Sequence, residues 1–481
     1  MIKKLEAKKI FFYILIIFGI LSIVYCLLSY TPYWDEGVYL TNGKWIYSQG
    51  SVGTYESQRP PLMAVVSGLF WKIGLNQIIF SKLFLLVIFL IALYCLYELS
   101  EKLYENSGIL SILSFISLGS ILFWINRVLS DLVGLSFLII SLYFLINKNK
   151  SYLCGIFIGL SFLFRYPCGS LLLVLFLYYF LDTVLVKSNF VENFKKLSLI
   201  VFGFLTLLIP FLILNYFFLN VFKYSFFDSI IKTFLNAQGM VAANSFDLAN
   251  NGFLYYLGAL LVSNLFLIAI IVYIYFLIKK KFKKTVFFLP LIFVIVYYIY
   301  VSLLVHYEVR YFLPIFPFCA LIFSFTILEL LKITNKFKKL KFITANKISI
   351  ILFILFIISF IGLIVIQIKS PISNEEKTYY SFFKNKTENT ILVDDPIFGI
   401  FIDNSKIVYL AGPTYASAII YQEKGKFKYL AYSDRSLSCF DNNPICLEKL
   451  EKFNTKIKEN FNLIYKSNFN NSNHYIYEIV K

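Results

Sequence analysis

Long apolar runs separated by short polar segments fill the first 369 residues. Many of these runs approach or exceed the ~18–20 residues that cross a bilayer as a helix. We read eleven spans, so the sequence predicts a polytopic α-helical membrane protein. The expected spans are 10–29, 78–100, 108–126, 131–147, 152–167, 169–186, 197–219, 253–278, 285–305, 311–331 and 348–368.

A shorter apolar stretch, 62–75, follows the first span and has too few residues to cross a membrane. We expect it to form an interfacial helix on the outer surface. A second outer loop is expected at 220–252.

The pattern changes from Ser370 onward, where short runs with strand character alternate with polar stretches. Strands interleaved with helices predict a small α/β domain. The sequence therefore predicts a membrane domain over 1–369 and an α/β domain over 370–481. The expected strands are 391–393, 406–410, 428–432, 463–466 and 475–480, and the expected helices are 414–423 and 445–460.

Composition agrees with a membrane protein, because 59% of the residues are hydrophobic and only 15% are charged. The net charge of +18 would suit a nucleic-acid-binding protein, but the lysines gather in short blocks between spans. Blocks of that kind on one side of the spans are the positive-inside pattern. They predict a plasma-membrane protein with a cytoplasmic N-terminus, an extracytoplasmic C-terminal domain and no nucleic-acid partner. The blocks are Lys3–Lys9, Lys187–Lys196, Lys279–Lys284 and Lys332–Lys347.

An acidic-aromatic segment, residues 30–62, directly follows the first span. Asp35 and Glu36 stand beside Trp34, and Arg59-Pro60-Pro61 closes the segment. Paired carboxylates near a bilayer are costly unless they are solvated or used, and aromatic residues are enriched at that depth. We expect this first outer loop, 30–77, to form the floor of an active site.

Further polar side chains are expected at the same membrane face, and the cations among them are arginines rather than lysines. Arginine binds phosphate in a bidentate manner better than lysine does. Each residue also has a plainer explanation, such as a solvated helix end with a snorkelling stem, and Asp131 suits a helix cap. Their gathering on one face favours a site. They are Glu56, Arg59, Arg127, Asp131, Arg165, His306, Glu308, Arg310 and Tyr311.

Metal and thiol chemistry receive little support from the sequence. His306 can be a metal ligand or a hydrogen-bonded polar residue, and a divalent metal is possible but not indicated. No D-x-D motif is present to hold a nucleotide sugar through a metal. Cys439 and Cys446 lie outside the apolar runs, where a local disulfide and two free thiols both remain open.

Five short motifs resemble one family in their order and expected membrane side: the GT-C glycosyltransferases. The protein O-mannosyltransferase and aminoarabinose lipid A transferase group is the most similar, over roughly residues 10–330. The motifs are W-D-E-G at 34–37, R-P-P-L at 59–62, R-V-L-S-D-L at 127–132, G-L-S-F-L-F-R-Y-P at 159–167 and R-Y-F-L-P-I-F-P at 310–317.

The resemblance implies transfer of a sugar from a polyprenyl- or dolichyl-phosphate donor to a glycan, protein or lipid acceptor, with no cofactor that is certain. It implies inversion at the anomeric carbon with Asp35 as general base. We assign Glu36 to orienting the acceptor or structuring the loop. The expected donor-phosphate ligands are Arg59, Arg165, Arg310 and Tyr311. The expected substrate-binding residues are Trp34, Arg127, Asp131, His306 and Glu308.

Two rival functions remain open. A lipid or sugar transporter or flippase predicts ionisable residues near mid-membrane and broken helices in paired halves. A non-catalytic membrane scaffold with a partner-binding tail would not need Asp35. The sequence favours the transferase because its charges stand at the ends of spans.

Overall fold

The computed structural model describes residues 4–28, 32–56, 59–218, 247–263, 266–280, 285–303, 308–334, 344–369, 373–384, 390–409, 427–434 and 444–479. The chain forms two compact units. The helical unit comprises Met1–Leu27, Lys82–Asn126 and Ser130–Ile366, and the mixed unit comprises Leu28–Ser81, Arg127–Leu129 and Gln367–Lys481. The acidic-aromatic segment and the C-terminal tail thus share one unit.

The helical unit is built from apolar helices joined by short connections. α4 begins in the mixed unit and α16 ends in it. The helices are α1 (Lys4–Leu27), α4 (Gln77–Leu103), α5 (Gly108–Ile116), α6 (Gly119–Ile125), α7 (Ser130–Ile146), α8 (Ser151–Phe164), α9 (Ser170–Val186), α10 (Phe190–Phe218), α12 (Asp247–Val262), α13 (Phe266–Lys280), α14 (Leu289–Ser302), α15 (Phe316–Thr334) and α16 (Ala345–Lys369), with 3-10 helices η1 (Tyr166–Gly169), η3 (Thr285–Phe288) and η4 (Val309–Ile315).

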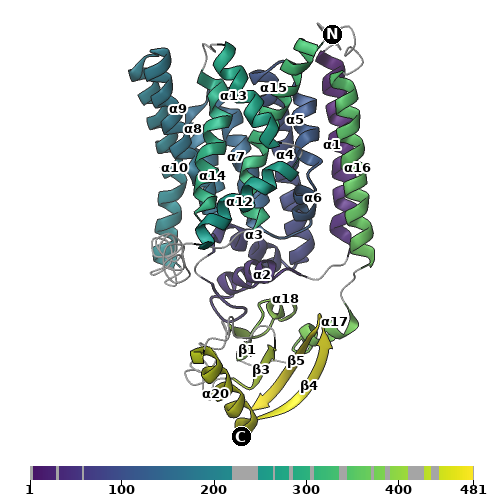
Figure 1. Ribbon diagram of the computed structural model, residues 1–481. Coiled ribbons are helices and arrows are strands. Elements are labelled where there is room, and N and C mark those ends of the chain that lie inside the picture. Colours follow the sequence, from purple (N-terminus) through teal and green to yellow (C-terminus); the bar gives the residue numbers. More distant parts are fainter. Residues whose placement is uncertain are drawn as a thin grey trace. The chain divides into compact units, whose positions relative to one another are not determined.

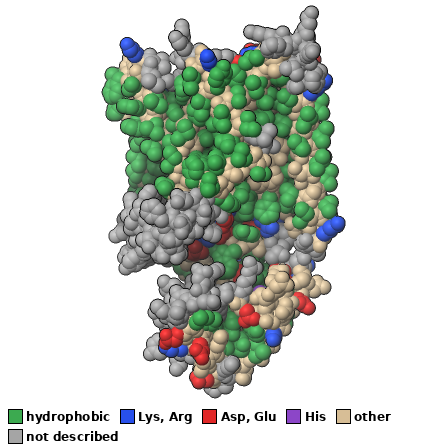
Figure 2. Space-filling view, in the orientation of Figure 1, with side chains coloured by type: hydrophobic (Ala, Val, Ile, Leu, Met, Phe, Trp, Pro, Cys, Tyr) green, Lys and Arg blue, Asp and Glu red, His purple; other side chains and the backbone are tan. Residues whose placement is uncertain are grey.

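Six helices of the described residues are long and apolar enough to cross a bilayer, or up to eight if each of two bent pairs is one span. Helices α7, α8 and α14 are apolar but shorter. Hydrophobic side chains cover the outward face of the helical unit in Figure 2, as expected where lipid replaces water. The predicted class, a multi-pass α-helical membrane protein, is confirmed, and the number of eleven spans stays a prediction.

Two of the expected spans are broken rather than continuous. The stretch expected as one helix at 108–126 is α5 followed by α6, with a bend of 70° between them. The stretch expected at 253–278 is α12 followed by α13, bent by 90°. Apolar composition predicts burial in lipid or protein but carries no signal for such a bend.

The first and last helices of the helical unit lie side by side in Figure 1. Phe18 of α1 stacks on Phe356 of α16 with ring centroids 5.8 Å apart, and it meets Phe360 edge-on at 6.3 Å. Aromatic pairs in these geometries add about 0.5–1.5 kcal/mol each beyond area burial. Aromatic packing therefore joins the two ends of the membrane-spanning part of the chain.

The tail forms a five-stranded sheet in the order β2-β1-β3-β5-β4. β1 pairs in parallel with β2 and β3, and the β4–β5 hairpin continues the sheet antiparallel from β3. All five predicted strands are present, and the helix predicted at 445–460 is α20. The elements are α17 (Asn374–Ser381), β1 (Thr390–Val393), α18 (Phe398–Phe401), β2 (Lys406–Tyr409), β3 (Tyr429–Ser433), α20 (Pro444–Asn460), β4 (Phe461–Phe469) and β5 (Ser472–Ile479).

Helices cover both faces of this sheet, as the alternation of side chains along β1 requires. Ile391 and Val393 pack in one core with residues of α17 and α18, such as Phe398. Leu392 points to the other face and packs in a second core with Phe453 of α20. Helices α17 and α18 were not predicted, and the helix expected at 414–423 lies outside the described residues.

The acidic-aromatic segment is not the loop that the sequence predicted, because Trp34–Tyr47 forms helix α2. The Tyr33 backbone N–H donates to the Glu36 carboxylate at 2.6 Å, which satisfies a donor at the helix start. Acidic residues in the first turn also suit the positive end of the helix dipole. The expected helix at 62–75 is present as α3 (Pro61–Lys72).

Candidate functional site

Asp35 lies in the first turn of α2 and is 4% exposed. Its Oδ1 accepts from an Arg59 terminal nitrogen at 2.6 Å, and Arg59 Nε also contacts Glu56 Oε1 at 3.2 Å. The sequence-predicted base and one sequence-predicted phosphate ligand are therefore ion-pair partners in this structure. The Arg59 guanidinium compensates the negative charge of the nearly buried Asp35 carboxylate.

Arg59 is held between two carboxylates. Burial acts to lower the pKa of Arg59, but the charges of Asp35 and Glu56 outweigh it and raise this pKa above its usual value. The Glu56 backbone is fixed as well, since its N–H donates to Asn42 Oδ1 at 2.9 Å and its carbonyl accepts from Asn42 Nδ2 at 3.2 Å. Helix α2 thus sets the position of the chain that carries Glu56 and leads to Arg59.

Glu36 has a different environment from Asp35, although the two are adjacent. It is 0% exposed, and its carboxylate accepts from the Val128 backbone N–H at 2.5 Å and lies 3.4 Å from Arg127. The Tyr33 backbone N–H donates to the same carboxylate at 2.6 Å. These bonds tie α2 to the Arg127–Leu129 segment, which supports the structuring role that the sequence offered for Glu36.

Gly37, the last residue of the W-D-E-G motif, touches the C-terminal sheet domain inside the mixed unit. A Cβ at Gly37 would lie 2.8 Å from the Ile397 backbone nitrogen and 2.8 Å from the Pro396 carbonyl carbon. Real Cβ atoms do not approach backbone that closely, so only glycine fits there. The motif therefore ends in glycine because the start of α18 packs directly against α2.

Lys44, one turn before the end of α2, anchors the same contact and was missed by the sequence analysis. It is 1% exposed, and its Nζ donates to the carbonyls of Gly399, Ile400 and Ile402 at 2.8, 3.0 and 3.1 Å. Asp403 completes the set at 2.7 Å. Lys44 is the single basic residue among the acidic and aromatic residues of 34–47, and that isolated positive charge is the signal that could have found it.

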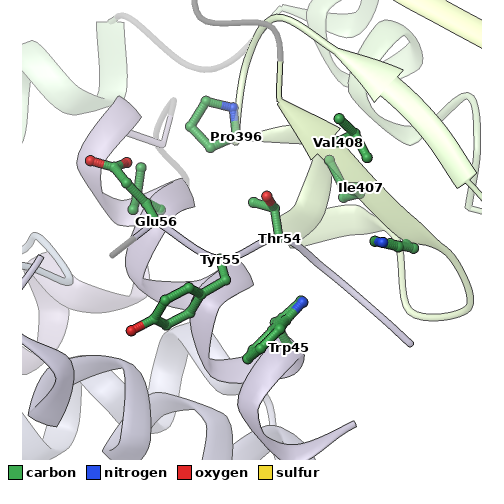
Figure 3. Close-up of a pocket in the computed structure, with 9 residues that line it drawn as sticks. Trp45, Thr54, Tyr55, Glu56, Pro396, Ile407 and Val408 are labelled. Carbon is green, nitrogen blue, oxygen red and sulfur yellow. The ribbon is translucent and has the colours of Figure 1, made fainter. Parts of the chain in front are cut away.

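A cavity of about 380 Å³ lies within the mixed unit, and Glu56 of the Asp35–Arg59–Glu56 ion pairs is part of its lining (Figure 3). Trp45 and Tyr55 supply aromatic rings whose centroids lie 4.9 Å apart. Glu56 lines the cavity and also contacts Arg59, so the cavity wall continues into the Asp35 ion pair. Its remaining lining includes Thr54, Pro396 and residues of β2.

The helical unit carries a second cluster of sequence-predicted residues. Arg165 lies 2.9 Å from Asp131 Oδ1, and both side chains are nearly buried. Arg310 forms an ion pair with Glu308, with Arg310 Nη2 3.1 Å from the Glu308 carboxylate. The Tyr311 ring contacts both arginines, whose guanidinium carbons lie 5.3 and 5.2 Å from its centroid.

The two clusters differ in charge balance. In the mixed unit, the carboxylates of Asp35, Glu36 and Glu56 outnumber the guanidiniums of Arg59 and Arg127. In the helical unit, two carboxylates match two guanidiniums. The first cluster therefore has one carboxylate more than it has guanidiniums, whereas the second has two arginines beside one aromatic ring.

The structure thus distributes the sequence-predicted residues over both units. Trp34, half-buried at the start of α2, lies in the mixed unit with Asp35 and Glu36. His306, Cys439 and residues 220–246 of the outer loop expected at 220–252 lie outside the described residues, and residues 247–252 of that expected loop are the start of α12. Among the residues that are described, no three His, Cys, Asp or Glu side chains form a group that could hold a metal ion.

A buried lysine near the start of α4 is a further polar feature that the sequence analysis missed. Lys82 is 2% exposed, and its Nζ donates to Asn126 Oδ1 at 2.8 Å and to the Cys26 carbonyl at 3.2 Å. Asn126 directly precedes Arg127 in the chain. Lys82 therefore anchors the chain just before the segment that holds Glu36.

Sequence comparison finds no matching family model and no matching curated protein. The fold does match solved structures. The structure of ArnT from Cupriavidus metallidurans bound to undecaprenyl phosphate matches with a TM-score of 0.68 at 9% identity, over 98% of each chain.

The oligosaccharyltransferase of Archaeoglobus fulgidus in the apo form matches with a TM-score of 0.55 at 11% identity, over 88% of this chain and 69% of that chain. The same protein tethered to an acceptor peptide matches at 0.56 and 10% identity, over 98% and 74%. The chain has the fold of the GT-C membrane glycosyltransferases. The resemblance drawn from the five motifs is confirmed at the level of the fold.

Proposed function

We propose that the protein is a membrane glycosyltransferase that takes its sugar from a polyprenyl-phosphate donor, with Asp35 as the general base. The observation that carries this proposal is the nearly buried Asp35 carboxylate, fixed in the first turn of α2 and paired with Arg59. The fold of ArnT, solved with undecaprenyl phosphate bound, supports a donor of that class.

The proposed reaction is a single displacement. Asp35 removes the proton from an acceptor hydroxyl or amine, whose oxygen or nitrogen then bonds to the anomeric carbon of the donor sugar. The bond from that carbon to the phosphate oxygen breaks, and the electron pair leaves with the polyprenyl phosphate. One displacement without a covalent intermediate inverts the anomeric carbon.

The arginines are proposed to bind the donor phosphate, since a guanidinium can offer two parallel N–H groups to phosphate oxygens. Arg165 and Arg310 present their guanidiniums around Tyr311. Arg59, in the mixed unit, also remains a proposed phosphate ligand, although it is paired with Asp35 in this structure. Trp34, Arg127, Asp131, Glu308 and His306 remain proposed contacts to the substrates.

The orientation follows from the lysine blocks, which favour a cytoplasmic N-terminus and an extracytoplasmic tail. The chemistry would then take place at the outer surface, where polyprenyl-linked sugar and acceptor meet.

Asp35→Asn tests the proposed base, because it keeps the side-chain shape and removes the proton acceptor. We expect turnover of a radiolabelled polyprenyl-phosphate sugar by the purified full chain to fall about 10²–10⁴-fold, the usual contribution of general-base catalysis. Binding of the donor should persist. A fully active Asp35→Asn variant would place the base elsewhere.

Arg165→Ala and Arg310→Ala test the phosphate site. Loss of a hydrogen bond to a charged group costs about 1.5–3 kcal/mol, so donor affinity should fall roughly ten- to a hundredfold. Lys72→Ala, at the exposed end of α3, is the matched control that removes a cation without affecting donor binding. Unchanged donor affinity in both arginine variants would remove them from the phosphate site.

A further inference from the structure

The cavity of the mixed unit combines two chemical features in its wall. Trp45 and Tyr55 give it an aromatic side, with ring centroids 4.9 Å apart (Figure 3). Glu56 and Lys406 bring charges of opposite sign to the same cavity, and Thr54 adds a hydroxyl. Its volume of about 380 Å³ lies within the range of ~300–1,000 Å³ that small-molecule pockets occupy.

The charge pattern selects among ligand classes. A phosphate or another anion would meet Glu56, and a cation would meet Lys406, so neither is favoured. A neutral molecule with many hydroxyls suits both groups, because a hydroxyl donates to the carboxylate and accepts from the ammonium. The C–H groups on the face of a sugar ring also suit the negative face of an aromatic ring.

The sheet edge beside the cavity argues against an extended peptide. β2 is an edge strand, and edge strands bind peptides by adding a further strand. That position is already taken, because Gly53 N–H donates to the Ser405 carbonyl at 3.1 Å and the Gly53 carbonyl accepts from Ile407 N–H at 2.8 Å. The chain's own Gly53 therefore occupies the edge at which an acceptor peptide would pair.

We propose that this cavity binds a neutral saccharide, the acceptor glycan of the transfer reaction. Calling this saccharide the acceptor rests on the proposed function. Glu56 and Arg59 connect the cavity to the proposed base. Glu56 lines the cavity and lies 3.2 Å from Arg59, whose other side is 2.6 Å from Asp35. A sugar seated on Trp45 and Tyr55 would thus lie against the network that carries the base.

The test measures binding to the purified full chain in detergent by saturation-transfer NMR. The probes are maltotriose, mannotriose and chitotriose, with a neutral hexapeptide containing serine and threonine as comparison. We expect at least one trisaccharide to bind and the peptide not to compete with it. Trp45→Leu should weaken saccharide binding roughly three- to tenfold through lost stacking, and Lys406→Gln roughly tenfold through a lost charged donor.

Lys377→Gln is the matched control, since Lys377 is exposed on α17 and does not line the cavity. Lys406 is also exposed, so its replacement should leave folding intact even where Trp45→Leu does not. The proposal fails if no trisaccharide binds, if only the peptide binds, or if binding is unchanged in both cavity variants.

Transfer assays separate this proposal from the proposed function. Saccharide binding that depends on Trp45 and Lys406, in a protein that transfers no sugar, would keep the cavity assignment and refute the transferase. Active transfer in which neither variant raises the KM for a saccharide acceptor would keep the transferase and refute the cavity assignment. Both proposals together predict a raised acceptor KM with the donor KM unchanged.

Discussion

Replacing Lys44 by methionine tests what holds α18 against α2. Methionine keeps the length and apolar stem of lysine and removes the ammonium. That ammonium serves three backbone carbonyls at the end of α18, at 2.8–3.1 Å, and the Asp403 carboxylate at 2.7 Å. The carbonyls would lose a charged donor, whereas Asp403 can turn to water.

The magnitude follows from the exposure of the two partners. Lys44 is 1% exposed, and loss of the hydrogen bonds from a charged donor to buried carbonyls costs about 1.5–3 kcal/mol. The Asp403 side chain is 57% exposed, so the ion pair alone is worth about 0–1 kcal/mol. Lys44→Met should therefore cost far more than Asp403→Asn, which keeps an acceptor for Trp71 Nε1, now 2.9 Å away.

Hydrogen–deuterium exchange of the full chain measures this difference locally. In Lys44→Met, amides of α18 and the start of β2 should exchange roughly 10–10²-fold faster, which corresponds to the lost 1.5–3 kcal/mol. In Asp403→Asn the same amides should change less than about fivefold. Equal effects in the two variants would show that the ion pair, and not the carbonyl contacts, holds α18.

Four further predictions follow from other positions. Glu36→Gln should lower the free energy of unfolding by about 1–3 kcal/mol, since an amide N–H would face a backbone donor. The Glu36→Gln protein that remains folded should keep a higher turnover rate than Asp35→Asn, which thermal unfolding and activity assays on the same samples will measure. Gly37→Ala should destabilise the mixed unit by about 1–3 kcal/mol through contact with the α18 backbone, read as a lower Tm; a Tm equal to that of the native chain would mean that α18 yields freely. Burial raises the pKa of Asp395 to about 6, so this carboxyl keeps its proton to a higher pH in the folded protein than in the unfolded chain, and the free energy of unfolding falls as pH rises from about 4 to 6. The stability of Asp395→Asn relative to the native chain should therefore increase by about 1–2 kcal/mol between pH 4.5 and pH 7.5. A difference that does not change with pH would contradict this. A reporter fused after Lys481 should be active only outside the cytoplasm, and cytoplasmic activity would mean a miscounted span.

The pH effect of Asp395 has to be read as a difference between variants, because His474 acts in the opposite direction. Burial lowers the pKa of His474 to about 4, so stability is lost as pH falls from about 6.5 toward 4. In the native chain the two contributions partly cancel. The Asp395→Asn comparison removes the histidine contribution, which both proteins share.

The sequence determined the class of this protein and the elements of its tail. Many apolar runs are as long as a bilayer is thick, so their length and number predict a membrane protein. Short runs of β-branched and aromatic residues predicted all five strands. In β1 successive side chains pack alternately into the two cores on either face of the sheet, as the geometry of a strand allows. The W-D-E-G and R-P-P-L motifs likewise gave the Asp35 and Arg59 candidates before their ion pair was visible.

Only the tertiary structure decided which residues act together. Glu36 is held by a backbone N–H of Val128, and no pattern of side chains along the chain reports where a backbone donor will lie. Lys44 stands out in the sequence as a lone basic residue, but its role depends on three carbonyls more than 350 residues away in the sequence. Hydrophobic patterns along the chain indicate which segments are buried. They do not indicate which distant segments contact each other, because those contacts depend on how the side chains pack in three dimensions.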